Sequence, residues 1–287
     1  MAIMATLICS CQKMEPVDTN SDNKLEFRIV AGTQNEISTY ASDKGGTVNV
    51  DKNIYDQRYI LEIYDGQDRI YRQVQNCEIG ESISFDVRLL AKKYTLALWA
   101  DFTPNGSKED NLYNTADGLY QVTYREGTTL KMLSMDNADA YCHVEELDLS
   151  SSGISMKNIV MQRPLGKIRF WTTDASNTLT PVVSKISLSG RDIPTTYNVL
   201  TGNCSGSLVS NEMYFEAIHE TSTVNGSDNE GYLLGNIYVF ADMQEEMYQT
   251  NIITYADDNR EIKIGEHTLD IPVKRNKLTT VTGNFFN

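Results

Sequence analysis

Hydrophobic and polar residues alternate with a period of two along much of the chain from Leu25 onward, which is the pattern of half-buried β-strands. In the first half, the alternating segments cover residues 25–30, 59–64, 70–74, 83–89 and 94–100. In the second half, they cover residues 167–171, 183–188, 237–240, 269–273 and 278–286. No helical periodicity persists for the roughly ten residues that a helix needs. The sequence therefore predicts an all-β protein of sandwich or barrel architecture.

Turn signals between these segments predict how the strands connect. Asp65-Gly66 joins two alternating segments and predicts a hairpin. The short link at residues 91–93 predicts two strands at the edge of a sandwich sheet. Gly265-Glu266-His267 predicts a hairpin between residues 262–264 and 269–273, and Lys274-Arg275-Asn276 predicts a polar turn before the last strand.

The length of 287 residues fits two domains, since one domain takes roughly 150 residues. The segment DLSSSGISMKN at residues 148–158 is short and rich in Ser and Gly, which is typical of a domain boundary. We therefore expect one β-sandwich over residues 25–152 and a second over residues 153–287.

The first eleven residues, MAIMATLICSC, are apolar and end in a small residue and a Cys. Ile8-Cys9-Ser10-Cys11 resembles a bacterial lipobox, which predicts a signal peptide over residues 1–10 and lipidation of Cys11. Residues 11–24 are then a flexible tether. A signal peptide should open with a basic residue, and none precedes Lys13, so we expect the true start codon to lie upstream. The alternative is an N-terminal strand or helix of a cytosolic protein.

The net charge of −14 argues against a nucleic-acid partner and against adsorption of the folded body to anionic lipid. No CxxC, HExxH or EF-hand spacing occurs, so no metal or cofactor is expected. The loop FTPNGSKEDNLYNTADG at residues 102–118 is rich in Asn and Asp, and turn formation explains this composition better than calcium binding does.

No catalytic constellation is evident in the sequence. Cys142 and His143 are adjacent, and neighbours on a strand point to opposite faces, so they cannot act as a nucleophile and its base. His219 and His267 each lie beside a Glu, which is typical of a solvated surface, and no GxSxG occurs. The chain is therefore predicted not to be an enzyme. Pairing of Cys77 with Cys142 stays open.

Three segments carry a family resemblance. They are DVRLLAKKYTLALWADF at residues 86–102, followed by LYNTADGLYQV, then VMQRPLGKIRFW at residues 160–171, and LDIPVKRNKLTTVTGNFF at residues 269–286. Together they resemble the fimbrillin-like lipoproteins of Bacteroidetes, the superfamily of FimA- and Mfa-type fimbrial subunits and anchors.

The resemblance implies two tandem transthyretin-like Greek-key β-sandwich domains on a lipoprotein exposed at the cell outer membrane. It also implies fimbrial or other surface proteins as partners, with assembly by β-strand addition. The candidate exchangeable first strand carries Leu25, Phe27 and Ile29, and a candidate C-terminal strand carries Val281 and Phe285. Arg residues where a protease could release the first strand are Arg58, Arg69 and Arg72. A stalk, tip or anchor role stays open, with an anchor or tip favoured.

A surface glycan-binding lipoprotein is the alternative function. Tyr113 lies in the polar loop, Tyr120 and Tyr124 follow it, and the three could stack against sugar rings if they are exposed together. Trp99 points opposite to the neighbouring Leu98, so it either enters a core or marks a contact face.

Overall fold

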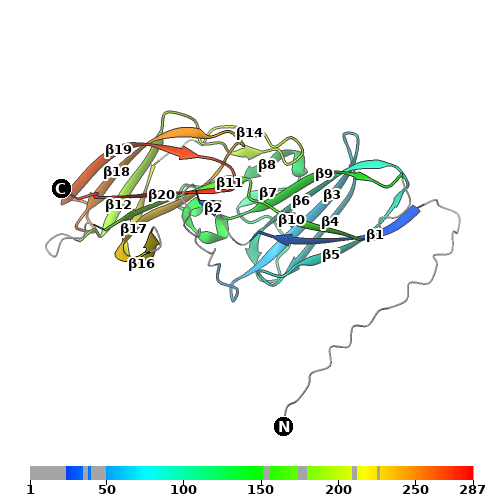
Figure 1. Ribbon diagram of the computed structural model, residues 1–287, viewed down its shortest axis with the longest axis horizontal. Helices are drawn as coiled ribbons and strands as arrows, with labels where there is room; N and C mark the ends of the chain where they lie inside the picture. Colours follow the sequence, from blue (N-terminus) through cyan, green and yellow to red (C-terminus); the bar gives the residue numbers. More distant parts are fainter. Residues whose placement is uncertain are drawn as a thin grey trace, which may run out of the picture.

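The computed structural model describes residues 24–34, 38–39, 50–150, 156–173, 180–208, 212–224 and 227–286. They form β-sheets and three 3-10 helices of three residues each. Figure 1 shows two sandwich halves side by side along the longest axis of the molecule. No helix in the described part of the chain is long and apolar enough to cross a membrane. The predicted all-β fold is confirmed.

The first sandwich pairs a three-stranded outer sheet with a four-stranded central sheet. The outer sheet has the order β10 (Met156–Met161), β1 (Lys24–Thr33), β5 (Ile83–Leu90). The central sheet has the order β4 (Asp68–Cys77), β3 (Tyr55–Asp65), β6 (Lys93–Pro104), β9 (Tyr141–Asp148). The inward side chains of both sheets share one core, which includes Phe27, Ile29, Leu61, Phe85 and Leu98.

The second sandwich pairs a five-stranded sheet with a four-stranded sheet. The first has the order β16 (Ile218–Val224), β17 (Ser227–Phe240), β11 (Leu165–Thr172), β20 (Lys277–Gly283), β2 (Ser38–Thr39). The second has the order β15 (Glu212–Glu216), β12 (Val183–Ser189), β18 (Glu246–Tyr255), β19 (Lys263–Val273). The chain thus visits the second sandwich at β2 before it builds most of the first.

A small sheet and the three 3-10 helices lie between the sandwiches (Figure 1). The sheet has the order β14 (Cys204–Ser205), β13 (Thr196–Tyr197), β8 (Val122–Tyr124), β7 (Tyr113–Asn114). The 3-10 helices are η1 (Leu119–Gln121), η2 (Met132–Ser134) and η3 (Asp136–Ala138). Their apolar side chains join the outer face of the central sheet to the second sandwich in one continuous core.

Trp99 shows how this layering works. Leu98 on β6 faces the core of the first sandwich, whereas Trp99 faces the other way. There its ring meets Tyr113 edge to face at 5.2 Å and lies 6.5 Å from Phe240 of the second sandwich. Both interpretations of Trp99 therefore hold, because the contact face of the central sheet is itself buried.

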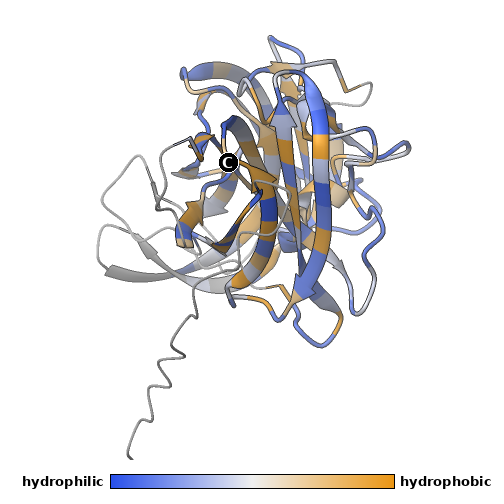
Figure 2. Cartoon of the chain, turned by 90° about the vertical axis from the view of Figure 1, so that its right-hand side faces the viewer, coloured by the Kyte–Doolittle hydropathy of each residue, from blue (hydrophilic) through white to orange (hydrophobic). Residues whose placement is uncertain are grey.

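The hydropathy pattern located most strands correctly but not all of their connections. β5 shows strict alternation of buried and exposed side chains, as expected. Figure 2 shows hydrophobic and hydrophilic residues alternating along strands of the protein. β3 and β4 form the expected hairpin. The link at residues 91–93 is not a connection within one sheet. β5 is an edge strand of the outer sheet, and β6 lies inside the central sheet.

The predicted hairpin around Gly265 is wrong, because Lys263–Val273 is one continuous strand paired with β18. A Cβ atom at position 265 would come within 1.8 Å of the carbonyl oxygen of Phe285. Glycine therefore serves a close backbone approach there and not a turn. The turn at residues 274–276 is present, with Asn276 at φ 56°, and it carries the chain from one sheet of the second sandwich to the other.

Residues 156–161 join the first sandwich, although they begin within the Ser- and Gly-rich segment of residues 148–158 and extend beyond it. They form β10, which pairs in parallel with β1. The first sandwich thus takes its third outer strand from the connection that leads to β11.

Candidate strand-exchange site and the junction beside it

Strand β1 occupies the centre of the outer sheet. It runs antiparallel to β5, with Phe27 opposite Val87 and Ile29 opposite Phe85. It runs parallel to β10 on its other side, with Ala31 opposite Ile159. Because β1 lies between two strands that do not pair with each other, removing it would leave a gap one strand wide.

The inward face of β1 fills the first core. Phe27, Ile29 and Ala31 are buried, and Leu25 packs partly against the same cluster. These positions are spaced two apart, as they must be on one face of a strand. The structure thus places the predicted first-strand residues in line on a buried face, which the sequence pattern anticipated.

The outward face of β1 is polar and held by surface ion pairs. Arg28 Nε lies 2.7 Å from Asp86 Oδ1, and Arg88 Nε lies 3.6 Å from Glu26 Oε1. The hydrogen bond to Asp86 raises the pKa of Arg28. Exposed ion pairs of this kind contribute little to stability. The attachment of β1 along its length therefore rests on its buried face and on its backbone ladders.

The C-terminal residues singled out from the sequence lie in the second sandwich. Val281 is in β20, whereas Phe285 follows that strand and is buried. The carbonyl oxygen of Phe285 accepts a hydrogen bond of 3.0 Å from Thr254 Oγ1. This segment therefore packs into its own domain and is not part of the outer sheet that contains β1.

The arginines offered as protease sites lie within strands. Arg58 is buried in β3 and donates hydrogen bonds to Asp101 and to Asp110, the latter at 2.9 Å. Arg69 and Arg72 lie in β4 and both pair with the buried Glu62. None of these three residues lies in the connection between β1 and β3, so they are poor sites for releasing β1.

The three tyrosines proposed as a sugar platform do not share a surface. Tyr113 and Tyr124 are buried, and their ring centroids lie 5.7 Å apart in the core between the sandwiches. Tyr124 also stacks on Phe240 at 4.6 Å, and only Tyr120 is exposed. This prediction was wrong because apolar residues of the second sandwich cover the loop that carries these rings.

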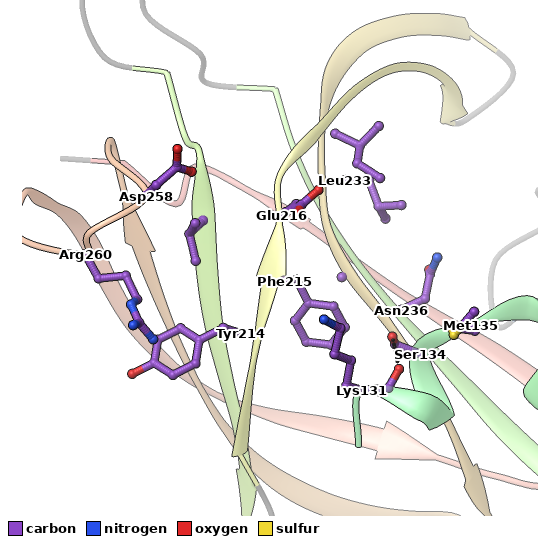
Figure 3. A pocket seen from close by; sticks show the side chains of 13 residues that line it. Lys131, Ser134, Met135, Tyr214, Phe215, Glu216, Leu233, Asn236, Asp258 and Arg260 are labelled. Atoms are coloured by element: carbon purple, nitrogen blue, oxygen red, sulfur yellow. Dashed lines mark hydrogen bonds between the residues drawn. The ribbon is translucent and has the colours of Figure 1, made fainter. Parts of the chain in front are cut away.

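An open hollow of about 640 Å³ lies elsewhere, where β15, β17 and the segment around η2 meet (Figure 3). Its wall includes Phe215 and Tyr214, and Arg260 stacks over the Tyr214 ring at 4.3 Å. Two acids and two bases line it, namely Glu216, Asp258, Lys131 and Arg260. Asn236 also lines it, and its buried Oδ1 atom has no hydrogen-bond partner among the described residues. No sequence pattern indicates this hollow, because its wall is assembled from segments as far apart along the chain as Lys131 and Arg260.

The Cys and His residues form no catalytic arrangement within the described ranges. Cys77, Cys142 and Cys204 are free thiols. The thiol of Cys142 lies 3.7 Å from the Tyr197 hydroxyl, whereas His143 Nε2 lies 3.5 Å from Glu145 Oε1. No three His, Cys, Asp or Glu side chains in those ranges are grouped to hold a metal ion.

Two of the motifs that carried the family resemblance meet at the junction of the sandwiches. Ala241 N donates to Pro164 O at 3.1 Å, and Asn276 N donates to Leu165 O at 2.8 Å. Arg275 N donates to Asp242 O at 3.0 Å. The RPLGKI and PVKRN segments are thus hydrogen-bonded neighbours, although 111 residues separate Leu165 from Asn276 along the chain. Sequence reasoning placed both motifs but could not show that they touch.

The fold and these sites define a two-sandwich all-β protein with a central, N-terminal strand in its first sandwich. The chain belongs to a family of unknown function, DUF6562, whose model matches residues 18–287. No curated protein matches the sequence.

Solved structures share the arrangement at low sequence identity. A candidate adhesin from Bacteroides thetaiotaomicron is 10% identical with a TM-score of 0.52, and the match covers 94% of this chain and 95% of that one. A candidate cell adhesion protein from Bacteroides ovatus is 13% identical with a TM-score of 0.45, covering 91% and 92%. The fimbrial anchor protein Mfa2 from Porphyromonas gingivalis is 11% identical with a TM-score of 0.40, covering 85% and 82%. The match to the Bacteroides thetaiotaomicron protein shows that its fold and the fold of this chain are shared.

Proposed function

We propose that this chain is a non-catalytic surface protein of the fimbrial or adhesin type that assembles by β-strand addition at the position of β1. The observation that carries the proposal is the central place of β1 between β10 and β5. An extended segment from a partner subunit that replaced β1 would regain two backbone ladders and the buried positions of Phe27, Ile29 and Ala31. The candidate adhesin that shares the fold supports the same class of function.

Release of β1 requires a break in the chain between β1 and β3. In the described part of that connection, Lys52 is an exposed basic residue, and it lies in the turn before β3 where a protease could cut. A protein that keeps β1 would instead act as an end of an assembly, as an anchor or a tip does. Both roles use the same site, and they differ in whether it is opened.

Assembly can be tested on the folded full chain. A recognition sequence for a specific protease is inserted within residues 40–49, the chain is cut after folding, and its mass is followed by size-exclusion chromatography with light scattering. We expect the cut protein to form oligomers and the uncut protein to remain monomeric. Equal masses for both would refute assembly through the position of β1.

We further propose that the protein is anchored in the outer membrane, exposed at the cell surface, by lipid on Cys11. Cys11 lies outside the described residues, and the lipobox resemblance is what supports the proposal. Dual acylation would anchor the protein stably. Cys11→Ala should abolish metabolic labelling with a fatty acid and release the protein from membranes. Retention of the variant in the membrane fraction would contradict the anchor.

Glycan binding is a second candidate function, and the hollow beside β15 favours it over the tyrosines suggested by the sequence. An aromatic wall, balanced charges and an unpaired buried acceptor on Asn236 suit a neutral polyhydroxyl ligand. Saturation-transfer NMR with glucose, galactose and N-acetylglucosamine tests this. Signal lost in Phe215→Ala and kept in Tyr120→Ala would support the hollow, and no signal from any of the three sugars would remove the candidate.

A further inference from the structure

The end of β1 is held by more than its sheet. Gln34 follows β1, and its N–H continues the ladder to β10 by donating to Met161 O at 3.0 Å. Its carbonyl oxygen accepts a hydrogen bond of 2.9 Å from Arg163 Nη1. Arg163 is fully buried, so this backbone carbonyl is bonded to a charged group away from water.

The guanidinium of Arg163 is fixed on its other sides as well. Its Nε lies 2.7 Å from Asp139 Oδ2, and its Nη2 donates to the Tyr141 hydroxyl at 2.9 Å. The Tyr141 hydroxyl donates in turn to Asp139 at 2.9 Å, and the Tyr141 ring lies 4.7 Å from the guanidinium. Burial alone would lower the pKa of Arg163, but the adjacent Asp139 carboxylate outweighs burial and the pKa is raised. The group that binds Gln34 is therefore charged and has one orientation.

A second motif reaches the same residue from the far end of the chain. Asn276 Nδ2 lies 3.5 Å from Gln34 Oε1, at the long end of the hydrogen-bond range. The backbone N–H of Asn276 bonds to Leu165, two residues after Arg163. The backbone of Gln34 thus contacts Arg163 of the RPLGKI motif, and its side chain contacts Asn276 of the PVKRN motif.

We infer that Arg163, oriented by Asp139, is the positioning residue that latches the C-terminal end of β1 and sets how readily this strand leaves the outer sheet. The inference rests on the proposed function, because it names the residue that controls how readily β1 leaves the strand-exchange site. Departure of β1 carries Gln34 away from Arg163 and breaks a charge-assisted hydrogen bond, which costs more than losing a neutral one. The latch lies at the junction, so the packing of the two sandwiches and the retention of β1 are coupled.

Hydrogen exchange measured by mass spectrometry on the intact, uncut chain tests the latch. Arg163→Lys keeps a positive charge near Asp139. It removes the planar guanidinium, which contacts Asp139 and Gln34 simultaneously. We expect amides of residues 27–33 to exchange at least about tenfold faster, with amides of β3 and β6 unchanged. Unchanged exchange in β1, or equal acceleration in β1, β3 and β6, would overturn the inference. The latter would show a structural role only.

Asn276→Gly is the second variant, for the case that Arg163→Lys does not fold. Glycine keeps the left-handed backbone at this position and removes the side-chain amide. It should accelerate the same β1 amides to a smaller extent, and no acceleration would count against the latch. Arg28→Lys is the matched control, because it alters a surface ion pair of the same strand, and it should leave exchange in β1 unchanged.

The failure of this inference and the failure of the proposed function can be told apart. Exchange is read on the uncut monomer, whereas assembly is read on the cut protein. Faster exchange of β1 without oligomers after cutting would retain the latch and refute the assembly. Oligomers after cutting, together with unaltered β1 exchange in the variants, would support the assembly and refute the latch.

Discussion

Ile29 of β1 lies directly opposite Phe85 of β5, and both side chains are fully buried in the core of the first sandwich. The pair joins a strand near the start of the chain to an edge strand of the same sheet. The burial of this pair shows that β1 contributes side chains to the core of the first sandwich.

Truncation of Ile29 should therefore be costly. Ile29→Ala is expected to lower the free energy of unfolding by about 2–5 kcal/mol, because it removes buried methyl groups and leaves a cavity. Arg28→Ala, one residue away on the outward face, should cost far less, because Arg28 and its ion pair with Asp86 are exposed. Denaturant titration followed by circular dichroism measures both. Equal effects would show that β1 is not packed as described.

Trp99 should matter to both sandwiches at once. Trp99→Ala is expected to cost about 3–5 kcal/mol, because the ring contacts Tyr113 and lies close to Phe240 of the second sandwich. Because the core runs through the junction, the wild-type protein should unfold in one calorimetric transition. Tyr120→Ala, at an exposed position in the same layer, is the control and should change little. Two separate transitions in the wild type would contradict a shared core.

Asp110 should make stability depend on acid pH. Burial would raise the pKa of Asp110, but hydrogen bonds from Thr115 and from Arg58 outweigh it, and the pKa lies below its ordinary value of 3.8. A carboxyl with a lowered folded pKa contributes stability above its unfolded pKa, and this contribution is lost as the pH falls below 3.8 towards the folded pKa.

Asp110→Asn tests this dependence. The variant should be about 1–3 kcal/mol less stable near neutral pH, with the difference from the wild type narrowing as the pH falls below 3.8. Asp117→Asn alters an exposed acid of the same loop and is the control. A difference that does not vary with pH would contradict the ion pair between Asp110 and Arg58.

The three free thiols in the described residues should be unreactive in the folded protein. Burial raises the pKa of Cys142 to about 11 and that of Cys204 to about 12, and burial with Glu81 nearby raises the pKa of Cys77 to about 11. At pH 8 only about one Cys142 in a thousand is a thiolate, the reactive form. Iodoacetamide should therefore label these residues slowly until the protein is unfolded in guanidinium. Rapid labelling of the folded protein would contradict their burial.

The sequence predicted where the strands lie better than it predicted which strands pair with one another. Alternation located β1, β5 and β6 because a strand half-exposed to water must place its apolar side chains two apart. It could not show that β5 and β6 belong to different sheets, since a short link serves both a hairpin and a crossing between sheets. It also suggested a turn at Gly265, where glycine instead admits the backbone of Phe285.

The candidate site was predictable only in part. The inward residues of β1 follow from the pattern, whereas the burial of Tyr113 and Tyr124 depends on packing against Phe240, more than a hundred residues away. The bond from Arg163 to Gln34 spans 129 residues and leaves no local signal. Contacts of this range are set by how whole sheets pack, and a single sequence does not show that.

The place of β1 in the outer sheet is tested most directly by peptide replacement. The protein is cut within residues 40–49, and a fluorescent peptide of residues 24–34 is added while its anisotropy is followed. We predict saturable binding of one peptide per chain, competed by the unlabelled peptide but not by the same peptide carrying Ile29→Asp. Release of the N-terminal fragment without any binding of the peptide would show that the gap left by β1 does not accept a strand, and it would contradict assembly by strand addition.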